Sequence, residues 1–419
     1  MSKFSIDLGV IGLGYVGLPL VVESTNSGLS VFGFDNNSDK INDLKNGNSP
    51  IEDISDNELK ESLSNGLLLS DSPEQLKDCE HIVISVPTPL TDYQPDLSYV
   101  KEAAKSIGEN ISKEQIVILE STTYPGTTIE VLIPEIEEVS GLKAGKDFYV
   151  GYSPERIDPG NEVWGFKNTP KVISGIDETS TEKIKEFYEK IIDEVVVVSG
   201  TREAEMVKLL ENTYRHVNIA FINELAVLCN MLEIDIWEVI DAARTKPFGF
   251  ESFRPGPGVG GHCIPIDPNY LSFKTRQIGK PVRFVELAQE INNTMPTYIV
   301  GRVLEMMNKL GKPMNNSSIL LFGVAYKKDI SDTRESPALH IIENLQSQGV
   351  NIGFYDPFVD ELDTSVPINK ETDLSKISKY DLILFHTPHS QFEEINFEEI
   401  EVPIFDATGV EYLKNSERI

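Results

Sequence analysis

The sequence contains few cysteines and no long apolar run. Only three of its 419 residues are cysteine (Cys79, Cys229 and Cys263), and no two of them form a CxxC pair. This spacing argues against a disulfide framework or a zinc site and favours a reducing compartment. No apolar stretch approaches the ~20 residues that span a bilayer, and no apolar N-terminal run follows basic residues. We therefore expect a cytoplasmic protein with no metal site and no membrane association.

Basic residues are also in deficit. The chain has 37 Lys and Arg against 67 Asp and Glu, a formal net charge of -30. Such a surface repels nucleic acid and anionic membranes, so neither is an expected partner. An anionic small substrate would need a local cluster of Lys and Arg. The 40% hydrophobic and 25% charged content is typical of a soluble globular enzyme, and the length predicts two or three domains.

The N-terminal segment has the pattern of a dinucleotide-binding turn. An apolar strand is predicted over 6–11, and it leads directly into Gly12-Leu13-Gly14-Tyr15-Val16-Gly17 and an apolar helix start. A second strand over 31–34 ends in Asp35. The glycines allow a pyrophosphate to approach the helix N-terminus, where free N–H groups favour anions. Asp35 should accept the ribose hydroxyls and repel a 2′-phosphate, which predicts NAD rather than NADP.

Further strands are predicted over 81–86, 116–119, 148–150 and 195–198, the last closing the N-terminal sheet. Ligands of doubly wound sheets bind at the carboxyl ends of strands. Pro87, Thr88 and Thr122 follow two of these strands, so we expect them to line the cofactor cleft.

A helical centre and a second α/β pattern follow. Apolar residues recur at three- and four-residue steps over 202–242 and predict one long helix, whose apolar excess suits either a dimer face or packing within the chain. Another helix is predicted over 284–304, and strands over 318–322, 350–354, 380–385 and 402–405. The predicted fold class is α/β, with two Rossmann-like doubly wound domains joined by a long central helix and a helical dimerisation region. The expected domains are 1–200, 201–312 and 313–419.

Three groups of residues are candidates for chemistry. Cys263 lies in a glycine-rich loop, Gly256 to Pro268, with Asp267 four residues later. It is either a nucleophile or a small buried hydrophobe. Lys208 and Asn212 are four apart on the predicted helix, and such a pair either faces solvent or stabilises an oxyanion. Glu155 follows Ser-Pro after a strand, where it is either solvated or part of a site.

These motifs occur in one order along the chain. They are the glycine turn, Val86-Pro87-Thr88-Pro89, Ser121-Thr122, Ser153-Pro154-Glu155-Arg156, Lys208 with Asn212, the Cys263 loop and Tyr326-Lys327 with Asp332-Thr333-Arg334-Glu335-Ser336-Pro337. In this order and spacing the chain resembles the UDP-glucose/GDP-mannose dehydrogenase family over essentially its whole length. Residues 245–250 (TKPFGF) and the GVGGHC form most resemble the branch that acts on UDP-N-acetylglucosamine, although enzymes for UDP-N-acetylmannosamine share GxGGHC.

The resemblance implies a reaction and a set of catalytic residues. A UDP-sugar would be oxidised at C6 from alcohol to carboxylate, with two NAD reduced, for surface polysaccharide biosynthesis. Cys263 would form a thiohemiacetal and then a thioester, and water directed by Glu155 would hydrolyse the thioester. Lys208 and Asp267 would help to form the alkoxide, and Asn212 and Lys208 would hold the oxyanions. Thr122 completes the expected catalytic set.

The resemblance also implies binding residues. The expected cofactor set is Gly12, Gly14, Tyr15, Val16, Gly17, Asp35, Lys40, Pro87, Thr88, Thr122 and Arg334. The expected substrate set is Glu155, Arg156, Lys208, Asn212, Lys246, Arg254, Gly260 and Lys327. The C-terminal domain would bind the uridine diphosphate, the active site would lie in a cleft between domains, and a homodimer or higher homo-oligomer is expected. The chain departs from the family pattern at Ile266, often lysine, and at Ile157-Asp158-Pro159, where some members have a second acid.

Two other functions compete with this one. A two-electron alcohol dehydrogenase on the same scaffold predicts one NADH per substrate and no need for Cys263. A non-catalytic NAD-binding sensor explains the glycine turn but leaves Cys263, Lys208 and Glu155 without a role. Within the leading function, UDP-N-acetylmannosamine and UDP-glucose are the alternative substrates.

Overall fold

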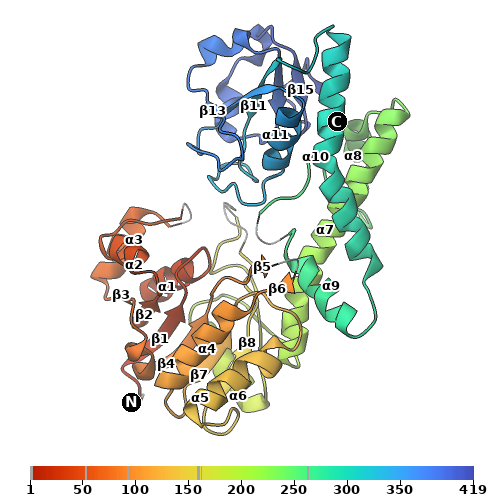
Figure 1. Cartoon of the computed structure of the whole chain (residues 1–419). Coiled ribbons are helices and arrows are strands. Elements are labelled where there is room, and N and C mark those ends of the chain that lie inside the picture. Colours follow the sequence, from red (N-terminus) through yellow and green to blue (C-terminus); the bar gives the residue numbers. More distant parts are fainter. Residues whose placement is uncertain (1–2, 52–53, 92–93, 158–160, 162, 262–263) are drawn as a thin grey trace. The chain divides into compact units, whose positions relative to one another are not determined.

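The chain folds into two compact units. The computed structural model describes residues 3–51, 54–91, 94–157, 161, 163–261 and 264–419. The first unit comprises Met1–Glu211 and Asn269–Lys280, and the second comprises Asn212–Pro268 and Pro281–Ile419 (Figure 1). Across the described ranges, no helix combines the length and the apolar character needed to cross a membrane.

The first unit is built on one large sheet. Among the described residues its strand order is β10-β9-β8-β7-β4-β1-β2-β3, parallel throughout except where β8 meets β9. The strands are β1 (Ile6–Ile11), β2 (Val31–Phe34), β3 (Leu68–Ser70), β4 (Cys79–Ile84), β7 (Ile116–Leu119), β8 (Tyr149–Tyr152), β9 (Lys171–Gly175) and β10 (Val195–Val197). A two-stranded ribbon pairs β5 (Leu90–Thr91) with β6 (Gln94–Pro95).

The helices of this unit are α1 (Gly17–Asn26), α2 (Ser38–Lys45), α3 (Asp56–Ser64), α4 (Ser98–Asn110), α5 (Ile133–Ser140), α6 (Glu178–Tyr188) and most of α9 (Asp267–Gln277). Successive residues of β4 and β7 are buried, so both faces of the sheet are covered, as their apolar sequences predict. The strand order reverses at β1, which pairs with β2 on one side and β4 on the other. The carboxyl ends of β1 and β4 are therefore the expected ligand crevice.

The second unit contains a smaller, wholly parallel sheet and long helices. Its strand order is β13-β12-β11-β14-β15-β16 over the residues that the structure describes. The strands are β11 (Ser318–Phe322), β12 (Asn351–Tyr355), β13 (Asn369–Lys370), β14 (Leu382–Phe385), β15 (Ile404–Asp406) and β16 (Glu417–Arg418). The helices are α8 (Ile236–Ala243), α10 (Arg283–Lys309), α11 (Pro337–Ser347) and the later part of α7 (Thr201–Met231). The prediction of two Rossmann-like sheets is confirmed.

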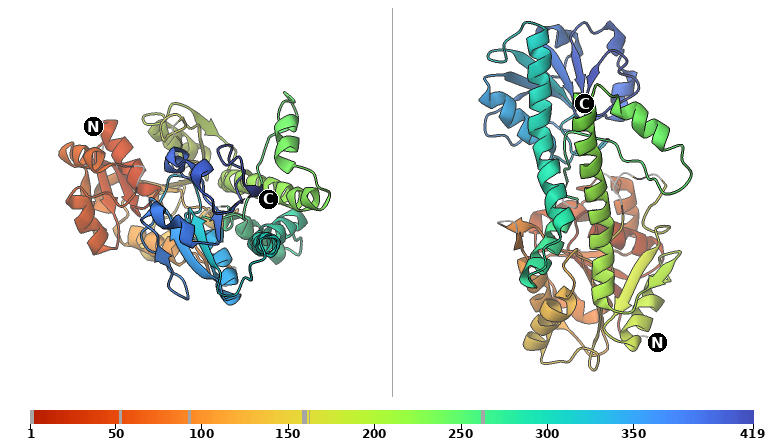
Figure 2. Two further views of the ribbon diagram at one scale, coloured as in Figure 1. Left: turned by 90° about the horizontal axis from the view of Figure 1, so that it is seen from above. Right: turned by 90° about the vertical axis from the view of Figure 1, so that its right-hand side faces the viewer.

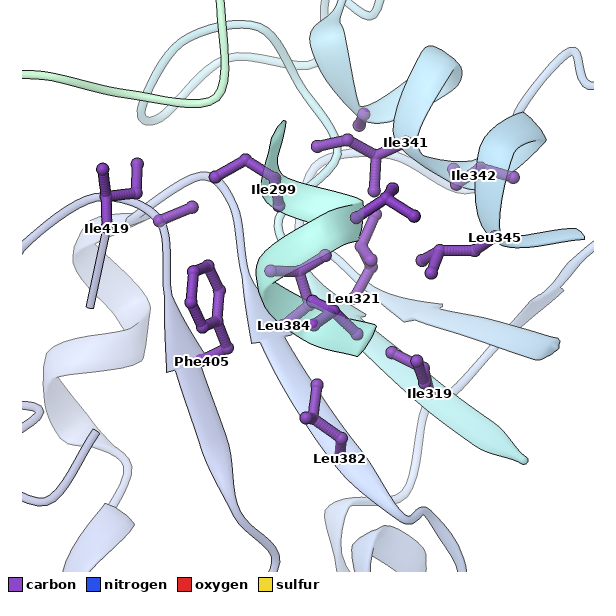
Figure 3. Close-up of a cluster of buried hydrophobic side chains, with 14 of the residues drawn as sticks. Ile299, Ile319, Leu321, Ile341, Ile342, Leu345, Leu382, Leu384, Phe405 and Ile419 are labelled. Atoms are coloured by element: carbon purple, nitrogen blue, oxygen red, sulfur yellow. The ribbon is translucent and has the colours of Figure 1, made fainter. Parts of the chain in front are cut away.

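The core of the second unit joins its sheet to its helices. Figure 3 shows Leu321 of β11 and Leu384 of β14 gathered with Ile299 of α10 and Ile341 of α11. All four are fully buried. Burying each such side chain contributes roughly 1.5–3 kcal/mol. This apolar contact fixes α10 against the sheet.

The prediction of one helix over 202–242 is wrong in one respect, because this segment forms two helices. α7 ends at Met231, and α8 begins at Ile236. Glu233 adopts a positive φ of 56°, and the Asp235 carboxylate accepts the N–H groups of Trp237 and Glu238 as an N-terminal cap. In the second unit α7 packs beside α10, as Figure 2 shows, with Ile222 and Ala226 in the same apolar cluster as Ile299.

Candidate active site

The glycine turn after β1 has the geometry of a dinucleotide cradle. Gly12 has φ +92°, and a Cβ there would lie 2.9 Å from the Ser85 carbonyl oxygen. A Cβ on Gly17 would lie 1.8 Å from the carbonyl oxygen of Gly12. A Cβ on Gly14 would meet no atom within 4 Å, and α1 begins without a side-chain cap. Two glycines thus permit the turn, and the third leaves open space beside uncapped N–H groups, which suits a pyrophosphate.

Asp35 stands at the end of β2 next to this turn. Its carboxylate accepts the N–H of Leu13 at 3.0 Å and the N–H of Asn37 at 3.1 Å, and it pairs with the Lys40 ammonium at 2.8 Å. Asp35 is buried, whereas the Lys40 side chain is 31% exposed. The structure therefore brings together the acid and the lysine that were predicted for the cofactor site. Tyr15 and Val16, also predicted, are half-buried in the turn.

The carboxyl ends of β4 and β7 are tied to each other. The Thr88 hydroxyl donates to the Thr122 carbonyl at 2.8 Å, and the Tyr270 hydroxyl of α9 donates to the Thr88 carbonyl at 2.6 Å. Pro87 is exposed beside them. These three predicted residues lie at one edge of the sheet, as the topology requires.

Glu155 is held by more partners than its sequence context suggests. The residue is 9% exposed. One carboxylate oxygen accepts the N–H groups of Arg156 and Ile157, each at 2.7 Å, and the other accepts from the Lys171 ammonium at 2.9 Å. Burial alone would raise the pKa of Glu155, but the charge and hydrogen bond of Lys171, the Ile157 N–H and the charge of Lys208 hold that pKa below its ordinary value. Glu155 is therefore a buried carboxylate that stays ionised.

Sequence reasoning missed the residues behind Glu155. Lys171, the first residue of β9, also pairs with Glu120 at 2.8 Å, and the Tyr188 hydroxyl donates to Glu120. Burial is the main cause that raises the pKa of Glu120, with the charge of Lys171 opposing it. Two signals are present in the sequence: Glu120 directly follows a buried strand, and Lys171 begins an apolar one.

A small cavity borders this cluster. Its walls include Glu155, Lys171, Phe166, Thr169 and Pro170. Its volume is about 10 Å³, close to the lower limit for one water molecule. The cavity therefore has the size for a water and polar groups to hold one, but no room for a sugar.

Lys208 and Asn212 both lie on α7, one turn apart, and both are buried. Lys208 acts electrostatically on Glu155 within the first unit. In the second unit the Asn212 amide donates to the Asp267 carboxylate at the start of α9. The polar pair predicted on this helix is thus not a solvated face.

Cys263, the predicted nucleophile, lies outside the described residues. The loop before it is held at two places in the second unit. The Gly256 N–H donates to the Asn223 side chain at 3.0 Å, and the Gly261 N–H donates to the Arg334 carbonyl at 3.1 Å. A Cβ on Gly260, a predicted substrate residue, would lie 2.7 Å from Tyr326. Glycine at this position therefore allows the loop to lie against the residues that follow β11.

Most of the remaining predicted binding residues contact other side chains of the protein itself. Arg156 pairs with Glu211 at 2.7 Å, and Arg254 pairs with Asp241 at 3.2 Å. Lys246 lies over the Phe248 ring, Arg334 pairs with Asp332 at 2.6 Å, and Lys327 follows Tyr326 after β11. Their roles toward a ligand stay predictions. No cluster of three or more His, Cys, Asp or Glu suited to a metal occurs within the described ranges.

Models of one protein family match the chain in three successive parts. The NAD-binding domain of the UDP-glucose/GDP-mannose dehydrogenase family matches residues 6–192, its central domain 202–294 and its UDP-binding domain 320–410.

Relatives with different named substrates resemble the whole chain. A UDP-N-acetyl-D-glucosamine 6-dehydrogenase of Salmonella typhi is 37% identical over 95% of this chain and 94% of its own. The solved UDP-D-ManNAc dehydrogenase of Pyrococcus horikoshii is 34% identical over 96% of both chains, with a TM-score of 0.88. A UDP-glucose dehydrogenase of Pyrobaculum islandicum is 26% identical over 100% of this chain and 98% of its own, with a TM-score of 0.89. With the glycine cradle, Asp35 and all three domain matches in place, the chain belongs to the UDP-glucose/GDP-mannose dehydrogenase family and is an NAD-dependent oxidoreductase.

Proposed function

We propose that the protein oxidises the C6 hydroxyl of UDP-N-acetylglucosamine to a carboxylate, with two NAD reduced per sugar, for surface polysaccharide biosynthesis. The observation that carries the four-electron reaction is the buried, ionised Glu155 within reach of the charge of Lys208. A two-electron alcohol dehydrogenase has no hydrolytic step and needs no such carboxylate. The TKPFGF segment and the 37% identical Salmonella typhi enzyme support the choice of sugar, with UDP-N-acetylmannosamine and UDP-glucose as alternatives.

The first step removes a proton and a hydride from the C6 alcohol. Asp267 takes the hydroxyl proton, directly or through water, and Lys208 stabilises the alkoxide. The Asn212 amide fixes the Asp267 carboxylate in place. Bound NAD, held by the turn from Gly12 to Gly17 and by Asp35, supplies the hydride acceptor for each of the two oxidations. Loss of the first hydride leaves an aldehyde.

The second step needs Cys263, because an aldehyde has to become tetrahedral before it can lose another hydride. The thiolate adds to the aldehyde carbon, and the oxygen takes up a proton to give a thiohemiacetal. Loss of that proton and of a second hydride leaves a thioester. Lys208 and Asn212 stabilise the negative oxygen at each tetrahedral stage.

The last step is hydrolysis of the thioester. Glu155 accepts a proton from water as the water oxygen bonds to the acyl carbon. The carbon–sulfur bond then breaks, Cys263 leaves as thiolate, and the carboxylate product forms. We assign the UDP to the C-terminal domain with Lys327, and the sugar and diphosphate contacts to Arg156, Lys246, Arg254 and Gly260.

Counting NADH tests this function directly. Incubation with excess NAD and limiting UDP-N-acetylglucosamine should yield two NADH for each sugar consumed, together with the uronic acid by mass spectrometry. UDP-N-acetylmannosamine and UDP-glucose run in parallel and should be slower in kcat/KM. One NADH per sugar with an aldehyde product would contradict the thioester route, and a faster alternative sugar would correct the substrate alone.

Asp35 and Lys40 should control the choice of cofactor in opposite directions. Asp35→Asn removes the negative charge that repels a 2′-phosphate, so the NAD/NADP ratio of kcat/KM should fall at least about tenfold. Lys40→Met leaves the Asp35 charge without its ammonium partner, so the same ratio should rise. Steady-state kinetics with both cofactors measure it, and an unchanged ratio in Asp35→Asn would contradict the ribose role.

We propose a homodimer formed through α7. Large apolar side chains of this helix stay exposed in the second unit: Phe221 at 53%, Leu228 at 47% and Met231 at 77%. They are spaced seven and three residues apart and so share one face of the helix. An apolar face of this kind favours association with a second copy.

A further inference from the structure

Glu155 is one end of a buried chain of polar side chains that the proposed mechanism does not otherwise use. Its carboxylate meets the Lys171 ammonium at 2.9 Å, and that ammonium meets Glu120 at 2.8 Å. The Tyr188 hydroxyl donates to Glu120 from the end of α6. The side chains of Glu120 and Lys171 are 0% and 5% exposed. All four residues belong to the first unit.

The topology explains why these groups meet. Glu120 follows β7 and Glu155 follows β8, so both lie at the carboxyl edge of parallel strands. β9 runs antiparallel to β8, with Tyr152 opposite Ser174. Its first residue, Lys171, therefore lies at this same edge. The change of strand direction between β8 and β9 thus places an ammonium between two carboxylates.

The two carboxylates are not equivalent. Both oxygens of Glu155 accept hydrogen bonds, whereas one oxygen of Glu120 has no hydrogen-bond partner among the described residues. One buried cation cannot neutralise two buried anions, and an unbalanced buried charge is costly. Glu155 accepts more hydrogen bonds and therefore keeps its negative charge. Glu120 is the carboxyl group of the two that more readily holds a proton. The opposite directions of their pKa values agree with this assignment.

Other charged and polar groups around the cluster come from each neighbouring element. Lys208 acts on Glu155 from α7, and Arg156, beside Glu155 in sequence, pairs with Glu211 of α7. The Phe166 and Tyr188 rings lie 5.7 and 5.3 Å from the Lys171 ammonium. Among the described residues Lys171 thus supplies a cation in direct contact with Glu155, and aromatic rings help to hold it there.

We propose that Lys171 is a positioning residue that fixes Glu155 as a carboxylate for the hydrolytic step, and that Glu120 weakens this hold by sharing the same ammonium. The proposal rests on the proposed function, since it assumes that Glu155 directs the hydrolytic water. In this proposal Lys171 acts through Glu155, which its ammonium contacts at 2.9 Å. Its removal should therefore affect breakdown of the acyl-enzyme and leave its formation intact.

The test uses the full-length enzyme with the double variant Lys171→Met/Glu120→Gln. This pair removes the ammonium together with the carboxyl group that shares it, so no buried Glu120 carboxylate is left without its partner where Lys171→Met alone does not fold. Without the ammonium, Glu155 should protonate at higher pH, so the acid limb of the kcat profile should move up by about one pH unit or more. KM for the sugar should change less than about threefold. Intact-protein mass spectrometry should show an accumulated acyl adduct after a burst of two NADH per subunit.

Two matched variants should not show this upward shift of the acid limb. Lys171→Arg keeps the cation and should restore the wild-type acid limb. Glu120→Gln alone frees Lys171 for Glu155, so its acid limb should stay at or below the pH of the wild-type limb. A purely structural role for Lys171 would lower kcat at every pH without moving this limb and without accumulating the adduct.

Glu155→Gln separates failure of the proposal from failure of the proposed function. If Glu155→Gln hydrolyses the acyl-enzyme at the wild-type rate, the role of Glu155 itself is wrong. If Glu155→Gln accumulates the adduct while the double variant has a wild-type pH profile and no adduct, the function stands and the role of Lys171 is overturned.

Discussion

Replacing Cys263 with serine is expected to lower steady-state formation of the uronic acid by at least about 10³-fold. A serine alkoxide is a poorer leaving group than a cysteine thiolate, so an oxygen-ester adduct should break down slowly and the covalent route should stop after adduct formation. NAD should bind as before, because the substitution leaves the glycine turn that forms its cradle unchanged. Product formation is followed by mass spectrometry and NAD affinity by fluorescence quenching.

Cys229→Ser is the matched control, because Cys229 is a free thiol on α7 outside the glycine-rich loop. This variant should retain wild-type turnover. Uronic acid formation at the wild-type rate by Cys263→Ser would mean that the nucleophile is wrongly assigned, and the chemistry would return to a two-electron alcohol dehydrogenase.

Gly17→Ala and Gly14→Ala should separate folding from cofactor binding. A Cβ at Gly17 would lie 1.8 Å from the Gly12 carbonyl oxygen. We expect Gly17→Ala to lower the free energy of unfolding by about 3 kcal/mol or more and to abolish NAD binding. A Cβ at Gly14 meets no atom within 4 Å. Gly14→Ala should change the free energy of unfolding by less than about 1 kcal/mol yet raise the Kd for NAD at least about tenfold.

Denaturant unfolding monitored by circular dichroism measures the first quantity, and titration with NAD measures the second. If Gly14→Ala bound NAD with wild-type affinity, the open space beside Gly14 would not be where the pyrophosphate lies. If Gly17→Ala were as stable as wild type, the expected clash between its Cβ and the Gly12 carbonyl oxygen would be wrong.

Much of the fold could be predicted because its signals are local. The strand over 6–11 is found at Ile6–Ile11, and the strands over 31–34, 116–119 and 318–322 are also found where expected. Each is a short apolar run that ends at a turn residue. Because these strands are buried on both faces, their sequences lack the alternation of polar and apolar residues that marks a strand with one exposed face. The Asp35 contacts follow from the same turn pattern.

What could not be predicted depends on contacts between distant segments. The charge of Lys171 on β9 suggests an exposed residue, because a sequence does not reveal that β9 reverses direction and brings this lysine to Glu120 and Glu155. The end of α7 was missed for a different reason. Apolar periodicity continues past Met231, and the break depends on the backbone conformation of Glu233 and the cap formed by Asp235.

The two hydrogen bonds that hold the glycine-rich loop have a consequence for the design of chimaeric enzymes. Gly256 is tied to Asn223 of the helical region, and Gly261 is tied to Arg334, which follows β11. The segment that leads to the thiol is therefore shaped jointly by parts of the chain that family boundaries assign to separate modules. Grafting the UDP-binding module of a relative onto this chain would also replace Arg334, whose carbonyl accepts the Gly261 N–H of the loop. Swaps intended to change the sugar should therefore exchange residues 256–337 as one block.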